Sequence, residues 1–423
     1  MHIILLSGGS GKRVWPLSND VRSKQFLSLI DDQKGGHESM LKRVYRQIRK
    51  VLKDVPILIA SGEAQYEQIL GEVGGSVEVV LEPARRDTFP AIALSCSYLS
   101  CEKHVSDDEI VLVLPVDVFA DLSYFEVLSR MADVATKDIA RLVLMGIKPS
   151  HPASSYGYIQ ISEQFSEYAL VKGFVEKPTV EVAQSLIDNG SLWNGGVFAF
   201  KLGYLMEIAQ KHFPGSTYRS LLAQYGSLEK ISFDYAVVEK TDSLAMVSYD
   251  GMWKDLGSWD TLTQEMGSKT VGQAVLALEE PQTSVVNELD IPVVALGTNN
   301  LVIAASLDGI LVADRRQCAS LKKHVESLSA LPRFESLRWG TKKVLLRKPG
   351  ASSVNYLTIK ADAEYGHTPE SDVVLVNMEG TAVLNTDQGP EAFMMLESKH
   401  IKQGQAYQIQ AETELHVLQI VKS

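Results

Sequence analysis

Residues 2–11 read HIILLSGGSG, a short apolar run that stops at a glycine-rich loop. A run that is apolar at every position predicts a strand whose two faces are both buried in a sheet. Comparable short runs recur at 57–60 (ILIA), 77–81 (VEVVL), 110–114 (IVLVL) and 142–147 (LVLMGI). The first 150 residues therefore predict a series of buried strands.

Helical patterns lie between these strands. Residues 37–53 place apolar side chains with a period of about 3.6, and residues 88–103 begin with a capping residue and a proline in the first turn. Strands that alternate with helices predict an α/β fold, a Rossmann-like domain with a mostly parallel central sheet. Ligands of such sheets bind beyond the carboxyl ends of the strands, so we expect the binding and catalytic residues directly after each strand.

The texture changes after about residue 265. Short strands at 293–296, 301–306 and 309–313 are joined by Asn-Asn and Asp-Gly pairs, which predict hairpins, and a basic helical stretch follows at 316–328. Residues 341–423 again alternate between strand-like runs and turns. We expect three parts, which are an α/β domain at 1–265, a small β-rich connecting segment at 266–335 and an all-β domain at 336–423.

The composition excludes several classes of protein. Apolar residues make up 45% of the 423 residues and charged residues 22%, as in an ordinary globular chain. Lys and Arg number 41 against 52 Asp and Glu, a net charge of −11 that argues against duplex DNA as a partner. Three cysteines without a C-x-x-C pair argue against disulfide frameworks and structural zinc. The apolar runs are too short for a signal peptide or a membrane span, so we expect a cytoplasmic protein.

The loop at 7–13 is suited to a phosphate chain, because glycines let the backbone approach a ligand and expose its N–H groups. It is not a Walker A loop, since position 6 is leucine, and the third glycine of a Rossmann fingerprint would fall at Val14. A plain tight turn explains the loop equally well. Arg13 and Lys24 favour the phosphate interpretation, because both could neutralise phosphate oxygens.

Two aspartates are candidate ligands of a divalent metal. Asp117 follows the strand at 110–114, and Asp255 lies in the segment WKDLGSW at 253–259. Mg²⁺ takes one or two carboxylates and fills its remaining positions with water and phosphate oxygens. Taken alone, Asp117 equally well caps a loop, and Asp255 equally well precedes a helix as its N-cap.

Two further segments carry polar groups that suit a sugar phosphate. Glu176 and Lys177 stand side by side in FVEKP, and Asn194 lies next to glycines in WNGGVF. A carboxylate and an amide can bond sugar hydroxyls, while a lysine can meet a phosphate. Without context, the first pair is an exposed ion pair and the second segment a turn before a buried strand.

Nine segments together resemble one family. In order, the chain carries LLSGGSGKRVWPLS, SKQFL, EPARRDTFPAIAL, LPVD, YGYI, FVEKP, WNGGVFAF, FDYAVVEKT and WKDLGSWD. This set resembles the mannose-1-phosphate guanylyltransferases, within the larger family of sugar-1-phosphate nucleotidyltransferases. The resemblance is dense over residues 1–265 and weaker beyond, where the tail is similar to the cupin-type domain of longer bacterial members.

The resemblance implies Mg²⁺-dependent transfer of GMP from GTP to α-D-mannose 1-phosphate, giving GDP-mannose and diphosphate. Another nucleoside triphosphate or another hexose 1-phosphate remains an alternative. The implied nucleotide-binding residues are Gly8, Gly9, Gly11, Arg13, Lys24, Glu82, Arg86, Asp87 and Thr88. The implied sugar-phosphate residues are Tyr156, Gly157, Glu176, Lys177 and Asn194. Asp117 and Asp255 are implied to hold the metal, and these two aspartates with Arg13 and Lys24 form the implied catalytic set.

Some motifs depart from the family pattern. Lys12 replaces the usual threonine of the loop, Ser23 replaces a proline, and Val118 replaces the histidine after the metal aspartate. The base segment at 85–89 (RRDTF) is also a variant, which weakens the inference of guanine. These variants leave a second class open, a non-catalytic regulatory subunit that binds a nucleotide sugar.

The tail departs more strongly. Longer family members carry a phosphomannose isomerase activity on the cupin domain, which needs a metal held by histidines and a glutamate. The matching stretch here is EYGHTPE at 364–370, where Pro369 stands in place of a second histidine, and His416 lies on a later strand. We therefore expect a degenerate, cupin-like domain that packs on the transferase domain or forms the interface of a homo-oligomer, and we disfavour a bifunctional enzyme.

Overall fold

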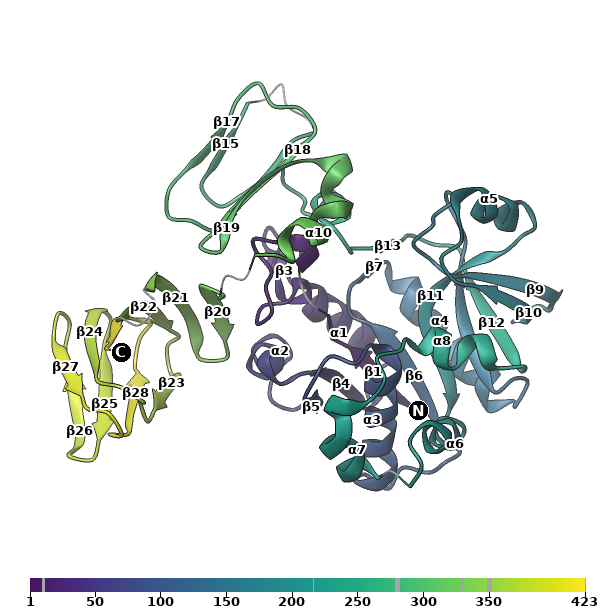
Figure 1. The fold of residues 1–423 in the computed structure, drawn as a ribbon, viewed down its shortest axis with the longest axis horizontal. Coiled ribbons are helices and arrows are strands. Elements are labelled where there is room, and N and C mark those ends of the chain that lie inside the picture. The colour runs from purple at the N-terminus through teal and green to yellow at the C-terminus, as the bar shows by residue number, and fades with distance from the viewer. Residues whose placement is uncertain (10–11, 216, 278–281, 329–330, 348–351, 423) are drawn as a thin grey trace. The chain divides into compact units, whose positions relative to one another are not determined.

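The structure is a computed structural model that describes residues 1–9, 12–215, 217–277, 282–328, 331–347 and 352–422 (Figure 1). The chain forms two compact units. The first comprises residues 1–9, 38–66 and 73–257, and the second comprises residues 10–37, 67–72 and 258–423. This grouping records which residues pack together; the three-part division at 265 and 335 stays a prediction.

A sheet of nine strands forms the centre of the first unit (Figure 1). Its spatial order is β5 (Glu78–Glu82), β4 (Ile57–Gly62), β1 (His2–Leu6), β6 (Ile110–Pro115), β11 (Leu192–Lys201), β8 (Leu142–Ile147), β12 (Leu244–Tyr249), β10 (Ala169–Val175) and β9 (Tyr158–Gln164). The first four strands in this order run parallel, as do β8 and β12. The expected α/β class and the five predicted strands are confirmed.

The other half of the sheet is mixed rather than parallel. β11 runs antiparallel to both of its neighbours, β6 and β8, and β9 and β10 pair antiparallel across a short turn. A short turn can only join antiparallel strands, because a parallel pair needs a long crossover. The antiparallel β11 brings its first residues to the edge where β6 and β8 end.

Helices cover both faces of this sheet. On one face, α3 (Thr88–Cys101) packs on β1, β4 and β5. It also contacts α6 (Leu202–His212), α7 (Tyr218–Gln224) and α8 (Phe233–Ala236). On the other face, α4 (Leu122–Thr136) packs on β6, β8, β11 and β12 and contacts α1 (Met40–Val51). Ile4 belongs to the cluster under α3, and its neighbours Ile3 and Leu5, which point the other way, are also fully buried. α5 (Val180–Asp188) also belongs to the first unit, whereas residues 67–72 of α2 (Tyr66–Val73) belong to the second.

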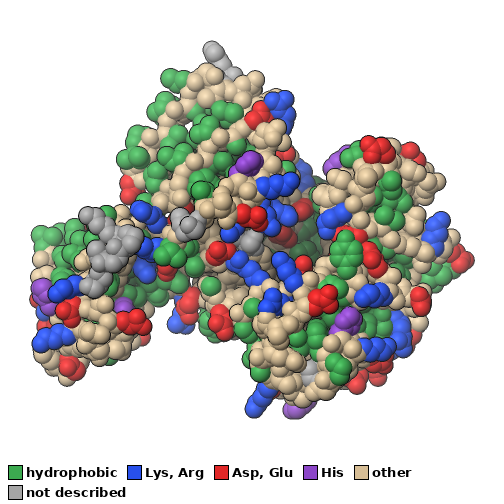
Figure 2. All heavy atoms as spheres, in the orientation of Figure 1, with side chains coloured by type: hydrophobic (Ala, Val, Ile, Leu, Met, Phe, Trp, Pro, Cys, Tyr) green, Lys and Arg blue, Asp and Glu red, His purple; other side chains and the backbone are tan. Residues whose placement is uncertain are grey.

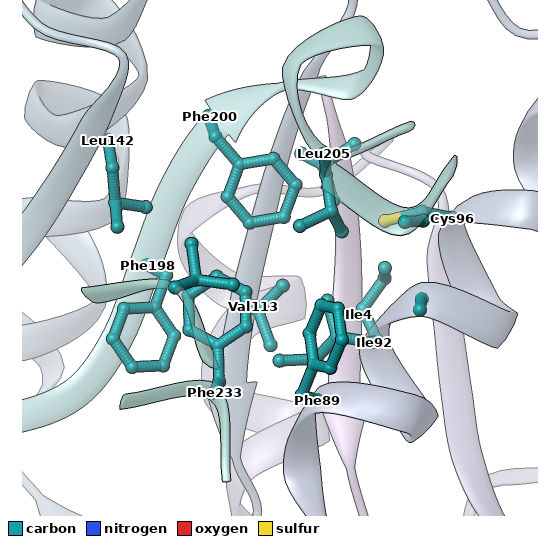
Figure 3. Packing of buried hydrophobic residues seen from close by; sticks show 14 of the residues in the cluster. Ile4, Phe89, Ile92, Cys96, Val113, Leu142, Phe198, Phe200, Leu205 and Phe233 are labelled. Carbon is teal, nitrogen blue, oxygen red and sulfur yellow. The ribbon is translucent and has the colours of Figure 1, made fainter. Parts of the chain in front are cut away.

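Aromatic side chains form the middle of the core between the sheet and α3 (Figure 3). The ring of Phe233 on α8 lies 4.6 Å from that of Phe198 and 6.1 Å from that of Phe200, both on β11, measured between centroids. All three side chains are buried, and burial of a phenylalanine contributes about 1.5–3 kcal/mol. This packing fixes the four-residue helix α8 against β11.

The order of the parallel strands creates a switch point between β1 and β6. From β1 the chain goes to β4 and β5 on one side, and it later returns to β6 on the other side. Leu6, the last residue of β1, pairs with Pro115 at the end of β6. The loops that follow these two strands, which carry Gly8 and Asp117, therefore leave the sheet at one edge, where ligands of open α/β sheets bind.

In the second unit, short strands between residues 270 and 314 form small sheets. β14 (Thr270–Val271), β16 (Ser284–Asn287), β18 (Leu301–Ser306) and β19 (Gly309–Asp314) form one sheet, and β15 (Ala274–Leu276) pairs with β17 (Val293–Ala295). The Asp-Gly hairpin between β18 and β19 is confirmed. The Asn-Asn hairpin is wrong, because β17 and β18 belong to different sheets and both pair in parallel with earlier strands. The basic stretch forms a 3₁₀ turn at Arg315–Ser320 and α10 (Leu321–Val325).

The short strands β14 to β19 pack around a small apolar interior. Val285, Ala295 and Ile303 form its buried centre. Outward-facing positions are also apolar, and Figure 2 shows hydrophobic side chains gathered over this region. Val294 and Val312 are 58% and 64% exposed.

Residues beyond 333 form two packed antiparallel sheets. One has the order β20 (Phe334–Leu337), β21 (Gly340–Arg347), β22 (Ser353–Ile359), β29 (Leu415–Val421), β24 (Val373–Glu379) and β27 (Ser398–Ile401), and the other β23 (Glu364–His367), β28 (Tyr407–Ala411), β25 (Ala382–Thr386) and β26 (Gly389–Phe393). The expected β-rich tail is confirmed. Across the described ranges of the chain, no helix is both long and apolar enough to span a bilayer.

Candidate active site

A short ladder brings the two predicted metal ligands together. β7 (Val118–Ala120) pairs antiparallel with β13 (Trp253–Asp255), and Asp255 stands opposite Val118, the residue after Asp117. The backbone N–H of Leu256 donates to the carbonyl oxygen of Asp117 at 3.2 Å. The aspartates, far apart in sequence, are therefore neighbours at the carboxyl end of β6.

Aromatic rings line the site beside these carboxylates. The ring of Tyr156 lies 5.0 Å from that of Trp193 and 5.4 Å from that of Trp253, between centroids. Burial raises the pKa of Tyr156 to about 12, and the negative charges of Asp255 and Asp117 act in the same direction. Both carboxylates therefore act electrostatically on one phenol at the sugar-phosphate side of the site.

The donor set fits Mg²⁺. Two carboxylates supply hard oxygen ligands, and Mg²⁺ commonly binds one or two carboxylates together with substrate phosphates. The part of the chain that the structure describes holds no group of three or more His, Cys, Asp or Glu residues placed to bind a metal. This arrangement is typical of a metal completed by its substrate rather than one caged by the protein.

The predicted sugar-phosphate residues also converge. A Cβ on Gly157 would lie 2.6 Å from Oε2 of Glu176 and 2.5 Å from the ring of Phe174, so only glycine allows this close approach. The carbonyl oxygen of Gly157 accepts from the backbone N–H of Asn194 at 2.8 Å. The ammonium of Lys177 pairs with Glu176, whose side chain is only 7% exposed. The structure thus brings these predicted residues into one cluster.

The backbone at Lys177 adopts a left-handed conformation, with φ of 44°. A non-glycine residue there costs of order 1–3 kcal/mol, and such strain concentrates at functional sites. Lys177 lies between the end of β10 and Pro178, and its ammonium pairs with Glu176.

Asp234, to which the sequence analysis gave no role, belongs to the same cluster. Nδ2 of Asn194 donates to Oδ1 of Asp234 at 2.7 Å. Burial, and next the charge of Glu176, raise the pKa of Asp234 to about 6, while Lys177 and Asn194 act in the opposite direction. The segment FDYAVVEKT was one of the nine motifs, so the signal was present, but nothing in the sequence connects it with Asn194.

The predicted base-binding side lies near the first glycine loop. A Cβ on Gly8 would stand 3.8 Å from Oε1 of Glu82, and the hydroxyl of Tyr225 donates to Oε2 of the same carboxylate at 2.6 Å. Burial raises the pKa of Glu82, against the effect of the Tyr225 hydrogen bond. Glu82 is therefore a half-buried acceptor beside the loop, and Tyr225, which the sequence analysis missed, orients it.

Three neighbouring residues have visible structural uses. Nε of Arg86 donates to the carbonyl oxygen of Tyr225 at 3.3 Å, and Asp87, with φ of 70°, accepts from the N–H of Thr88 at the start of α3. Oγ1 of Thr88 accepts from the N–H of Phe233 at 2.8 Å, which ties α3 to α8. Their roles toward a nucleotide stay predictions.

The remaining residues predicted to bind phosphate belong to two different units. Gly8 and Gly9 are exposed at the end of the first segment of the first unit, and Gly11 lies outside the described residues. Arg13 and Lys24 lie in the second unit, in 3₁₀ turns at Lys12–Val14 and Lys24–Phe26. Their predicted contacts with the triphosphate stay predictions.

The two histidines of the tail point to different sides of the β sandwich. Along β29, Leu415, Val417 and Gln419 face the interior, so His416 faces outward. His367 lies on β23 beside Tyr407, with 5.2 Å between the ring centroids. In the interior of the sandwich, the side-chain amide of Gln419 donates to the hydroxyls of Tyr365 and Tyr407 at 3.0 Å each. This placement supports the expectation of a tail without a catalytic metal.

Comparisons with known proteins find relatives of this chain. Residues 2–270 match the model of the nucleotidyl transferase family. The mannose-1-phosphate guanylyltransferase of Klebsiella pneumoniae is 31% identical over 428 residues, 91% of this chain and 88% of the relative. The alginate biosynthesis protein AlgA of Pseudomonas aeruginosa is 28% identical, over 94% of this chain and 87% of that protein. The crystal structure of mannose-1-phosphate geranyltransferase from Thermus thermophilus is similar, with 28% identity, a TM-score of 0.65, and coverage of 78% of this chain and 99% of that one.

The environment of Asp234 predicts a pH-dependent change in stability. Because its folded-state pKa of about 6 exceeds its ordinary value of 3.8, the ionised form destabilises the fold; this cost is small near pH 4, grows up to about pH 6 and is full above it. We expect Asp234→Asn, which cannot ionise, to stabilise the protein by about 1–2 kcal/mol at pH 8. Thermal unfolding should show a rise of a few degrees at pH 8 and little change at pH 4.5.

The exposed Asp242 offers a control, since Asp242→Asn should alter the melting temperature equally at the two pH values. An Asp234→Asn variant that is no more stable than the wild type at pH 8 would contradict this account of the carboxylate.

Proposed function

The chain belongs to the nucleotidyl transferase family, among the mannose-1-phosphate guanylyltransferases, and we propose that it converts GTP and α-D-mannose 1-phosphate to GDP-mannose and diphosphate. The observation that carries this proposal is the β7–β13 ladder, which unites Asp117 and Asp255 beside the cluster of Gly157, Glu176 and Asn194. A paired-carboxylate site next to a sugar-phosphate site is what this transfer requires.

In the proposed reaction, a phosphate oxygen of mannose 1-phosphate attacks the α-phosphorus of GTP in line. The bond from the α-phosphorus to its new oxygen forms, and the bond to the oxygen that bridges to the β-phosphorus breaks, so that diphosphate leaves with that oxygen. The chain provides no nucleophile in this scheme. Its contribution is to hold the two reactants in line and to stabilise charge.

Asp117 and Asp255 would hold Mg²⁺, and the family generally uses a divalent metal. When bound, Mg²⁺ neutralises the charge that accumulates on the phosphate oxygens. The two aspartates would supply the oxygen ligands, and the rings of Tyr156 and Trp253 pack against each other on the neighbouring side. Neutral Tyr156, whose pKa is raised to about 12, remains a hydrogen-bond donor at every physiological pH.

The sugar phosphate would bind along Tyr156, Gly157, Glu176, Lys177 and Asn194. The carboxylate of Glu176 is suited to accept from two hydroxyls of a hexose, and the exposed end of Lys177 is suited to the phosphate. Gly157 is itself buried, and its lack of a side chain lets Glu176 and Phe174 lie close to its backbone.

The nucleotide would bind along the loop of Gly8, Gly9 and Gly11 and along Glu82, Arg86, Asp87 and Thr88, with Arg13 and Lys24 on the triphosphate. The backbone N–H groups of a glycine loop after β1 are suited to phosphate oxygens. Glu82, a half-buried acceptor beside Gly8, is suited to bind the edge of the base.

We further propose that the protein is cytoplasmic, that its domains divide at 265 and 335, and that the tail is a degenerate cupin-like domain that packs or mediates a homo-oligomer. The outward direction of His416 and the Gln419–tyrosine network support a tail without isomerase activity.

A kinetic screen tests the activity directly. We expect diphosphate release from GTP with mannose 1-phosphate and Mg²⁺, with a higher kcat/KM than for ATP, CTP or UTP or for glucose 1-phosphate. Preference for another pair would keep the transferase and change its substrates. Absence of turnover with every pair would leave a non-catalytic nucleotide-sugar-binding subunit as the better account.

Asp117→Asn should lower kcat far more than it weakens nucleotide binding, by about 10²-fold or more, because metal-borne charge stabilisation matters most in the transition state. Single-turnover rates and calorimetric GTP affinity, measured on one preparation, separate the two effects. Unchanged kcat would remove Asp117 from the metal site.

Glu176→Gln should raise the KM for mannose 1-phosphate by about tenfold, the loss of roughly one charge-assisted hydrogen bond, while the KM for GTP changes less than about twofold. Steady-state kinetics with each substrate varied in turn provide both constants. Equal changes in the two constants would indicate a general disturbance of the fold instead of a sugar-phosphate contact.

A further inference from the structure

Apolar packing and a helix cap fix the position of Asp234, and the charge of its side chain is not needed for this. Its helix α8 is anchored by Phe233, which packs on Phe198 and Phe200 (Figure 3), and the hydroxyl of Ser232 caps it by accepting from the N–H of Tyr235 at 3.4 Å. These contacts would form with an uncharged residue at position 234. The carboxylate is therefore not needed to build the helix.

The side-chain amide of Asn194 is held from both ends. Its Nδ2 donates to Oδ1 of Asp234 at 2.7 Å, and its Oδ1 accepts from the N–H of Gly196 at 3.2 Å. A flipped amide would turn its oxygen toward the carboxylate of Asp234, which cannot donate when ionised. Asp234 thus selects one of the two orientations of this amide.

The groups around Asp234 belong to the proposed sugar-phosphate site. Lys177 and Glu176 follow β10, Asn194 lies on β11, and the backbone of Asn194 bonds Gly157 at 2.8 Å. The carboxylate is close enough to Glu176 for the like charge to act on it. A partly buried carboxylate next to another carboxylate is costly to the fold, which points to a use in the site.

We propose that Asp234 is a positioning residue for the sugar phosphate: its carboxylate fixes the amide of Asn194 in the orientation that bonds hydroxyls of the hexose. The inference rests on the proposed function and adds the residue that sets this subsite. Asp234 acts through Asn194 and does not touch the reacting atoms. Its loss therefore affects the affinity for the sugar phosphate, not that for the nucleotide.

A double-mutant cycle tests this relation. Asp234→Ala is expected to raise the KM for mannose 1-phosphate about tenfold, or about 1.4 kcal/mol, with the KM for GTP within about twofold. In an Asn194→Ala background the same substitution should change the sugar-phosphate KM less than about twofold, because the group it positions is gone. Asp234→Asn retains an acceptor oxygen and should stay within about threefold of the wild type.

Controls separate a positioning role from a general structural one. Asp242→Ala, on an exposed aspartate, should leave both KM values unchanged. Additive effects of the Asp234 and Asn194 substitutions, or equal rises in the two KM values, would overturn the inference. Asp234→Ser, too short to reach Asn194, replaces the alanine variant if that variant does not fold.

Calorimetric titration of mannose 1-phosphate distinguishes this inference from the proposed function. If the wild type binds the sugar phosphate but releases no diphosphate, the proposed activity fails, and an affinity of Asp234→Ala that is about tenfold weaker still supports the positioning role. Equal affinity of the two proteins, or absence of binding to the wild type, overturns it.

Discussion

The three residue pairs between β7 and β13 are the contact on which the site depends. They place Asp255 beside Asp117, at the carboxyl end of a buried parallel strand, so that two carboxylates share one small volume. Like charges at short range repel each other unless a cation lies between them. Burial, and next the charges of these carboxylates, raise the pKa of Tyr156 beside them. Backbone pairing holds this arrangement, so the carboxylates need not stabilise it themselves.

The sugar-phosphate side is built on the antiparallel strand β11. Its phenylalanines bury Phe233 and thereby hold α8, while its first residues carry Trp193 and Asn194 to the edge where the parallel strands end. Core packing and site geometry are thus set by one strand. Two residues whose conformation or charge is unfavourable lie at this edge and not in the core: Lys177, with its left-handed backbone, and Asp234, with its partly buried carboxylate.

The interior of the C-terminal β sandwich contains neutral polar groups among its apolar side chains. Its interior is closed by a network of Asn355, Gln419, Tyr365 and Tyr407, in which the amide of Gln419 bonds both phenols and accepts from Asn355 at 2.9 Å. Such neutral groups satisfy one another and offer no charge to a metal. The interior of the β sandwich is therefore filled by neutral polar groups that bond one another.

Local patterns determined the class of the fold: the apolar runs at 2–6, 57–60, 110–114 and 142–147 became buried strands, and the periodic segments between them became helices. The motifs also marked Asp117, Asp255, Glu176 and Asn194. Only the tertiary structure decided which strands pair, that β11 runs antiparallel, that the Asn-Asn turn joins different sheets, and that Asp234 and Tyr225 reach the site. Periodicity records which face of an element is buried, whereas partners distant in sequence are chosen by the packing of the whole core, which no local pattern contains.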